Sequence, residues 1–197
     1  MTATVPHTES AATRSVDGVE VPIAGTYAID ASHTDVSFVV RHLMLSKTRG
    51  RFPTVEGTIV IGEDPLDSRV EVSIETAGVE TGDDHRDQHL RSPDFFDADQ
   101  HPRMTYRSRA VRPTGPGRWI VDGDLTIRDV TRPVELDLSF EGGLTDPWGN
   151  VRAGFTASAE INRDEFGLTW NQLLEGGGVL VGRTVSIEIE AELVRAA

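Results

Sequence analysis

Apolar and polar residues alternate with a period of two along much of this 197-residue chain. The pattern is clearest in residues 69–75, 134–141 and 185–193, where apolar residues occupy every second position and charged or hydroxyl residues fill the others. Successive side chains of a β-strand point to opposite faces of the sheet, so this alternation predicts strands with one buried and one exposed face.

No long amphipathic helix is available to cover the apolar faces of these strands. Only the region near residues 83–97 is too polar for a buried strand, and we expect it to form a short helical segment. The sheet must therefore cover itself, either as a sandwich or as a closed barrel. About eight antiparallel strands can enclose an interior that is filled by side chains or left open for one small ligand.

The segment 151–161 bears on whether that interior is open. Its expected inward-facing set includes three alanines, Ala153, Ala157 and Ala159. A tightly packed barrel would need larger side chains at these positions. Either the barrel keeps space for a ligand or bulky neighbours such as Trp119 and Phe140 fill it, and periodicity alone leaves both interpretations open.

Length and composition indicate one domain with a tail. Hydrophobic residues make up 38% of the chain and charged residues 26%, which is enough apolar material for one core. Residues 1–22 are rich in Thr, Ser, Ala and Glu and lack periodicity, so we expect a flexible N-terminal tail there. Residues 23–197 are expected to form the barrel domain.

Charge and composition exclude several classes of function. The net charge is −13 and no basic stripe is present, which argues against nucleic acid as a partner. The chain has no cysteine, so disulfides, thiolate zinc sites and a cysteine nucleophile are excluded. The N-terminus lacks the apolar run of a secretory signal, and no segment is long and apolar enough for a membrane span. We therefore expect a cytoplasmic protein without stable membrane insertion.

Several short motifs occur in an order that resembles one known family. They extend from about residue 25 to residue 195 and include Asp30-x-x-His33, Gly50-Arg-Phe52, Arg86-Asp87-Gln-His89-Leu90, Asp94-Phe95-Phe96-Asp97, Gly123-Asp-Leu125-Thr-Ile127 and Arg163-Asp-Glu-Phe166-Gly167. Each motif is weak alone, whereas the ordered set resembles the YceI-like, or polyisoprenoid-binding, family.

The resemblance implies a lipocalin-like antiparallel β-barrel with an elongated apolar tunnel. In the family this tunnel holds a polyisoprenoid or isoprenoid-quinone chain, often in a homodimer. One turn departs from the family pattern, because Arg128-Asp129 stands where the family has His-Gly. The turn therefore lacks a glycine, and a histidine that could contact the ligand is absent.

An isoprenoid-like molecule is the expected ligand, and we expect no other cofactor and no metal. The predicted ligand-binding residues are large apolar or aromatic side chains within the strands and the motifs above. They are Phe38, Phe52, Phe95, Phe96, Met104, Tyr106, Leu125, Ile127, Phe155, Phe166, Leu168 and Trp170. Arg86, Asp87 and His89 are expected to hold the helical segment over one barrel end, with Leu90, Phe95 and Phe96 turned inward.

Two functions compete at this level. The first is a non-enzymatic carrier or sequestering protein for the isoprenoid-like ligand. The alternative is an isomerase- or cyclase-type enzyme that acts on a polyene or quinone, with His33, Tyr106 or Arg163 as the acid or base. A third interpretation is a stress-related protein whose ligand is incidental.

The histidines admit both functional and structural interpretations. His33 could contact a ligand head group or bind a metal together with His42, or it could simply hydrogen-bond to Asp30. His85 and His89 stand four residues apart, which on a helix places them on one face as a possible metal pair. The simpler interpretation is that they belong to a polar loop.

Overall fold

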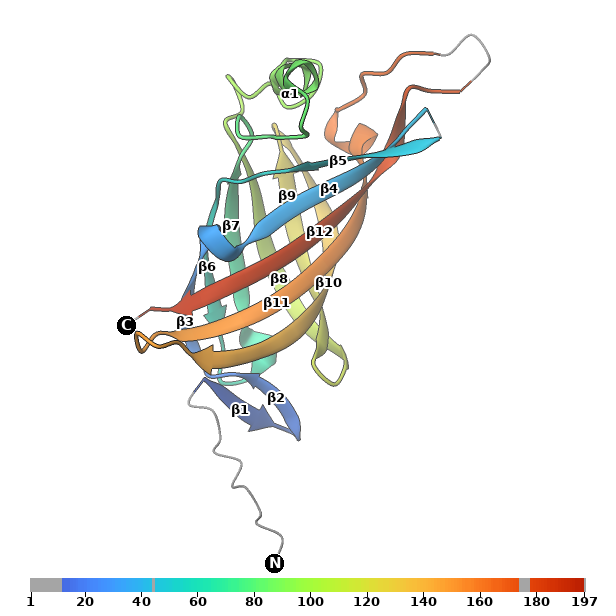
Figure 1. The fold of residues 1–197 in the computed structure, drawn as a ribbon. Helices are drawn as coiled ribbons and strands as arrows, with labels where there is room; N and C mark the ends of the chain where they lie inside the picture. The colour runs from blue at the N-terminus through green and yellow to red at the C-terminus, as the bar shows by residue number, and fades with distance from the viewer. Residues whose placement is uncertain (1–11, 44, 174–177, 197) are drawn as a thin grey trace, which may run out of the picture.

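The computed structural model describes residues 12–43, 45–173 and 178–196. Within these ranges the chain forms twelve strands, one α-helix and three 3-10 turns (Figure 1). The strands are β1 (Thr13–Val16), β2 (Val19–Pro22), β3 (Gly25–Ile29), β4 (Asp35–His42), β5 (Ser46–Arg51), β6 (Val55–Ile61), β7 (Arg69–Glu75), β8 (Arg103–Gly115), β9 (Arg118–Ile127), β10 (Val130–Thr145), β11 (Val151–Asn162) and β12 (Val181–Arg195). The helical elements are η1 (Ala31–His33), η2 (Pro65–Asp67), α1 (Asp84–Arg91) and η3 (Arg163–Phe166).

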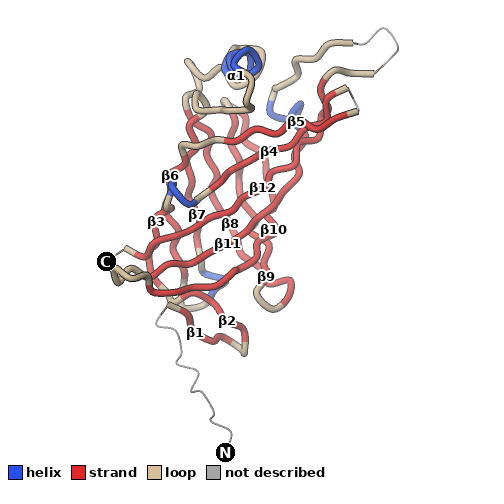
Figure 2. Tube along the Cα trace, viewed as in Figure 1, coloured by secondary structure: helices blue, strands red, loops and turns tan. Residues whose placement is uncertain are grey.

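Eight of the strands close into an antiparallel barrel. Their order around the wall is β3, β6, β7, β8, β9, β10, β11 and β12, and β12 pairs with β3 to complete the ring. Figure 2 shows that strands make up this wall, while the helical elements lie at its margins. The prediction of an all-β barrel of about eight strands with one short helix is confirmed.

Strand β12 pairs with two strands, β3 and β4, along the same edge because it is much longer than β3. Its last residues pair with β3, from Leu193↔Ile29 to Arg195↔Tyr27. Its earlier part pairs with β4, which in turn pairs with β5. The β4–β5 hairpin therefore extends the wall at the same end of the barrel as α1 (Figure 1).

The predicted alternation corresponds to the inner and outer faces of the wall. In β9 every second residue is buried, beginning with Trp119 and ending with Ile127. The residues between them face outward, where Asp122 accepts a hydrogen bond from Arg112 at 2.9 Å. Buried apolar side chains thus hold the barrel together, whereas exposed ion pairs of this kind contribute little to stability.

The N-terminal assignment needs a correction. Residues 13–22, which the sequence analysis placed in a flexible tail, form the β1–β2 hairpin. Asp17 and Gly18 make its turn with φ angles of 51° and 80°, a backbone conformation that Asp and Gly tolerate better than most residues. Strands of four residues are too short to produce a clear alternation. Residues 1–11 of the expected tail lie outside the described residues.

The predicted helical segment begins with α1 at one barrel end. The Asp83 carboxylate accepts a hydrogen bond from the Arg86 amide at 3.0 Å, which caps the helix and lowers the pKa of Asp83. The helix ends at Arg91, and turns continue the segment to Phe96. No helix in the described ranges has the length and hydrophobicity needed to cross a membrane.

Candidate ligand-binding cavity

The barrel encloses an apolar cavity of about 300 Å³. All eight strands of the closed ring contribute lining residues, and nearly all of these are apolar. Among them are Phe155, Ala157 and Ile161 of β11, the strand whose alanines are compatible with either a filled or an open interior. Trp119 also lines the cavity, and Phe140 packs on Phe155 at 5.3 Å, yet neither fills it. The interior is therefore partly open.

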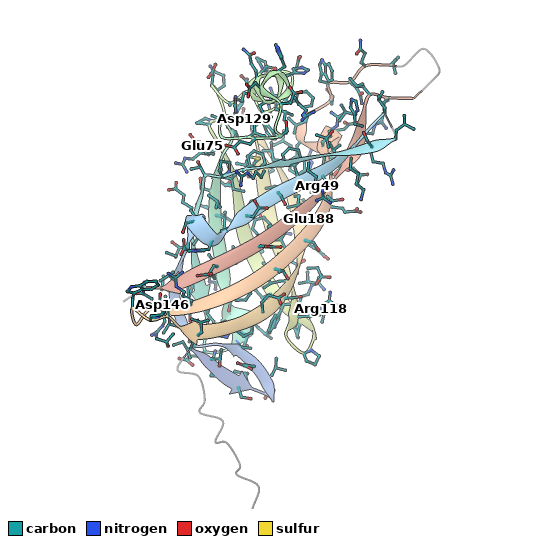
Figure 3. All side chains as sticks on the ribbon, in the orientation of Figure 1. Arg49, Glu75, Arg118, Asp129, Asp146 and Glu188 are labelled. Carbon is teal, nitrogen blue, oxygen red and sulfur yellow. The ribbon has the colours of Figure 1, made fainter. Side chains whose placement is uncertain are left out.

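Almost all charged side chains of the described residues lie outside this interior. Figure 3 shows Arg49 and Glu188 on the outer wall, where they form an ion pair of 3.0 Å, and places Asp129 and Asp146 at opposite ends of the barrel. The inner face contains one charged lining residue among those described, Arg163. Such a surface favours a guest without charge, because a buried unpaired charge is costly.

Most of the predicted ligand-binding residues line the cavity. These are Phe38, Phe52, Phe95, Phe96, Met104, Tyr106, Leu125, Ile127, Phe155 and Leu168. Phe166 and Trp170 do not. Phe166 is buried in the surrounding core, and the Trp170 ring packs edge-on against His89 at 4.5 Å. Both lie in or next to η3, outside any strand, where alternation does not determine the direction of a side chain.

Sequence reasoning missed two groups of lining residues. The larger group is aliphatic and alternates along the strands, so the period-two pattern could have identified it: Val36, Val40, Val55, Ile59, Ile74, Val121, Leu136, Leu138, Val185, Ile187 and Ile189 are among its members. The smaller group, Val21 and Pro22, comes from the β1–β2 hairpin. The Asp17-Gly18 turn signal could have revealed that hairpin.

The α1 end of the cavity is covered by residues 76–102. Leu90, Phe95 and Phe96 point inward from this cover, as the sequence predicts. The Arg91 guanidinium donates to the carbonyl oxygens of Ala77 at 2.6 Å and Val79 at 2.8 Å. These bonds give hydrogen-bond donors to two carbonyl oxygens of an irregular segment, which lacks the regular backbone pairing of a strand or helix.

The same cover is fastened by a buried carboxylate. Asp87 accepts hydrogen bonds from the Thr81 amide at 2.9 Å and the Thr81 hydroxyl at 2.5 Å. Arg86 donates to Thr81 as well, at 2.6 Å to its hydroxyl oxygen. Arg86 and Asp87 therefore fix the turn from Thr81 into α1, with bonds that lie within the cover itself.

The β9–β10 turn reaches the cover from below. Arg128 and Asp129 form this turn in place of the His-Gly pair of the family pattern, and Arg128 adopts a φ of 55°. Its side chain donates to the Phe95 carbonyl at 3.4 Å, and Asp129 lies 3.5 Å from the His101 ring. The charged turn thus contacts the cover, so the loss of glycine is compatible with a tight hairpin.

The three groups considered for acid or base chemistry are all engaged or remote. The Tyr106 hydroxyl donates toward the carbonyls of Val121 at 2.8 Å and Val134 at 3.2 Å, and burial raises its pKa well above the ordinary value. His33 is exposed, hydrogen-bonds to Asp30 at 3.0 Å and does not line the cavity.

Arg163 is buried and binds only backbone carbonyls and a neighbouring carboxylate. It donates to Gly182 at 2.9 Å, to Trp170 at 3.0 Å and to Leu168, while Asp164 lies 3.9 Å away. Desolvation lowers its pKa, but a guanidinium remains charged at physiological pH. This arrangement ties η3 to β12 and does not present Arg163 as a proton donor.

One cluster could in principle hold a metal ion. Asp30, His33 and Glu192 have ligand atoms within 4.8 Å of one another. Arg152 donates to Asp30 at 2.7 Å and also contacts Glu192, so a positive charge already bridges these carboxylates. Hydrogen bonds from Ser32 and Arg152 lower the pKa of Asp30. The cluster has the character of an ion-pair network.

The histidines of the cover are arranged differently. His89 contacts the Asp94 carboxylate at 2.9 Å and packs edge-on against Phe95 and Trp170. Neither His85 nor His89 belongs to a group of three ligand-type side chains within the described ranges. His89 thus connects the cover to the segment that follows η3.

Comparisons with known proteins match this architecture. The family model of the YceI-like domain matches residues 27–193. A UPF0312 protein of Vibrio parahaemolyticus is 37% identical over 146 residues, which cover 73% of this chain and 77% of the relative.

Two solved structures have the same fold. A YceI protein of Campylobacter jejuni is 27% identical, with a TM-score of 0.68 and coverage of 85% of this chain and 96% of that one. A domain of Saccharophagus degradans, described as polyisoprenoid-binding, is 16% identical with a TM-score of 0.67 and coverage of 86% and 98%. The fold and the match of the family model over most of the chain agree, and this protein belongs to the YceI-like family.

Proposed function

We propose that this YceI-like protein binds an apolar isoprenoid-like chain, such as a polyisoprenoid or an isoprenoid quinone, inside the barrel and carries or stores it. The enclosed apolar cavity is the observation that supports this most directly. The description of the Saccharophagus degradans domain as polyisoprenoid-binding points to the same class of ligand.

The energetics fit a carrier. Each methylene group removed from water contributes about 0.8 kcal/mol, so several isoprene units outweigh the cost of ordering the chain. A bilayer offers the same chain a similar gain. The protein would therefore make the ligand dispersible and exchangeable instead of trapping it irreversibly.

The enzyme alternative lacks comparable support. Tyr106 and Arg163 already use their polar atoms on backbone carbonyls, and His33 lies outside the cavity lining. Acid or base catalysis needs a group within hydrogen-bond reach of the reacting atom. We therefore propose binding without chemical conversion.

The direct test is extraction of the purified protein with organic solvent, followed by mass spectrometry of the extract. We expect an isoprenoid lipid, or stoichiometric uptake of an added polyprenol or quinone that is recovered unchanged. An extract without lipid, together with no uptake of either compound, would contradict the proposal. Isomerisation and cyclisation leave the mass unchanged, so a ligand recovered with a changed chromatographic retention time or absorbance spectrum would favour the enzyme.

A pair of variants on β11 locates the binding site. Ala157 lines the cavity, whereas the next residue, Ser158, is exposed on the outer face. Ala157→Phe should lower polyprenol affinity by at least about tenfold because the ring occupies ligand volume. Ser158→Phe should leave the affinity unchanged. Equal affinities for both variants, with unchanged circular dichroism, would place binding elsewhere.

A further inference from the structure

The β1–β2 hairpin forms the floor of the cavity. Val21 and Pro22 at the end of β2 are buried and line the cavity. Ile61 ends β6 and Trp119 begins β9, so the antiparallel order of the strands places both at the same barrel end, opposite α1. Both also line the cavity. In Figure 1 the hairpin lies across this lower end.

The bond from Arg14 to Gly62 holds the hairpin against the barrel, whereas the bonds from Arg14 to Pro22 and from Ile23 to Ala12 close the hairpin itself. The Arg14 guanidinium donates to the Gly62 carbonyl at 2.7 Å and to the Pro22 carbonyl at 3.3 Å. The Ile23 amide donates to the Ala12 carbonyl at 3.1 Å. A side chain at Gly143 of β10 would lie 2.9 Å from the Thr13 methyl group, so glycine allows the hairpin to approach the wall closely.

The hairpin is separate from the barrel in two respects. Its two strands form a sheet of their own, without ladder pairing to the ten-stranded sheet. It also precedes residue 27, where the match to the YceI-like family model begins. Pro65 and Ser68 of the η2 connection also line the cavity at this end, so the floor combines a part of the matched domain with a hairpin that lies outside it.

We propose that this hairpin closes one end of the cavity and sets the maximum length of the apolar chain that the protein accepts. The inference rests on the proposed function. A chain inside the barrel gains free energy with each unit that it buries. Once its tip reaches Val21 and Pro22, any further unit must remain in water or displace the hairpin. Affinity rises with chain length up to a limit and then stops rising.

The test is a series of all-trans polyprenols that lengthens by one isoprene unit at a time, with the affinity of each for the 197-residue chain measured. The Phe side chain has four more carbon atoms than that of Val, and an isoprene unit has five. Val21→Phe should therefore shorten the longest accepted polyprenol by one unit. Val21→Ala should raise the affinity of the first disfavoured length by about tenfold. Glu20→Ala is the matched control, since Glu20 is an exposed neighbour on the same strand and does not line the cavity.

A second measurement does not depend on how the variants repack. A polyprenol of the limiting length, with a photoreactive group on its terminal unit, should crosslink to Val21 or Pro22 of the unaltered protein. Mass spectrometry of the fragments identifies the labelled residue.

The outcomes separate the two proposals. A limit that moves with Val21 and not with Glu20, together with labelling of the hairpin, supports the inference. A limit that both Val21 variants leave unchanged, or labelling confined to the α1 cover, overturns it while polyprenol binding persists. Failure of every polyprenol to bind overturns the proposed function and this inference with it.

Discussion

The two ends of the barrel are closed in different ways. At the α1 end, irregular segments cross the opening, and Arg91 and Arg163 satisfy their backbone carbonyls. At the other end, a short hairpin packs Val21 and Pro22 against the opening, and Arg14 connects it to β6. The first closure lies within the part that matches the YceI-like family, and the hairpin precedes that part.

This difference indicates that the barrel wall and the segments that close its ends are stabilised by different interactions. Pairing of the eight strands leaves both ends to be covered by other segments. A closure that depends on the buried guanidinium of Arg163 and the partly buried one of Arg91 cannot be opened without loss of several hydrogen bonds. Because the hairpin shares no strand pairing with the wall, we expect it to open locally at a lower cost than the wall.

The largest expected effect is at the α1 end. Arg163→Met should lower the free energy of unfolding by about 4 kcal/mol, because several buried carbonyls lose their donor. Arg163→Lys should restore only part of this, since an ammonium group cannot reproduce the planar fork of hydrogen bonds. Urea unfolding measures both changes.

Arg183→Met is the control for that prediction. Arg183 is exposed and pairs with Asp164 at 3.0 Å, so its loss should cost at most about 0.5 kcal/mol. Equal unfolding midpoints for the Arg163 and Arg183 variants would show that burial of Arg163 contributes nothing to the closure.

A smaller and local effect is expected at the hairpin end. Arg14→Ala removes the hydrogen bonds to Gly62 and Pro22, so amide hydrogen exchange in residues 12–22 should accelerate by about tenfold. The urea midpoint should stay close to that of the unaltered protein. A global loss of stability as large as that of Arg163→Met would remove the distinction between the two ends.

The smallest effect near neutral pH involves the ion pairs around Arg152. Hydrogen bonds from Arg152 to Asp146, and from Ser32 and Arg152 to Asp30, lower the pKa of both carboxyls below their ordinary values. The unfolded chain therefore binds protons first as the pH falls below about 4, so the stability that these two carboxyls contribute is lost in that range and is fully present above it.

Asp146→Asn tests this pH dependence. The variant should show a shallower decline of unfolding free energy in acid than the unaltered protein, as followed by urea unfolding at several pH values. Asp129→Asn is a suitable control because Asp129 is exposed at the opposite barrel end. Parallel curves for the unaltered protein and Asp146→Asn would contradict the role of this carboxyl.

Much of the wall could be predicted because strand geometry translates directly into alternation. Val185, Ile187 and Ile189 in β12 point inward as their spacing predicts. Outside strands this relation fails. Leu168 lines the cavity, whereas Trp170, two residues later, turns toward His89. The direction of a loop side chain depends on the contacts available in the folded protein, and a period-two pattern in the sequence does not predict those contacts.

The sequence by itself determined that this chain is an antiparallel sheet that covers its own apolar faces, because it has no helices to cover them. Its ordered motifs indicated the family and, through that resemblance, the barrel. Only the tertiary structure decided that space remains in the interior and that Val21 and Pro22 form its floor. Cavity volume depends on how all the inner side chains fit together. The position of the hairpin depends on Gly62 and Gly143, which are distant from the hairpin in sequence and lie next to it only after folding.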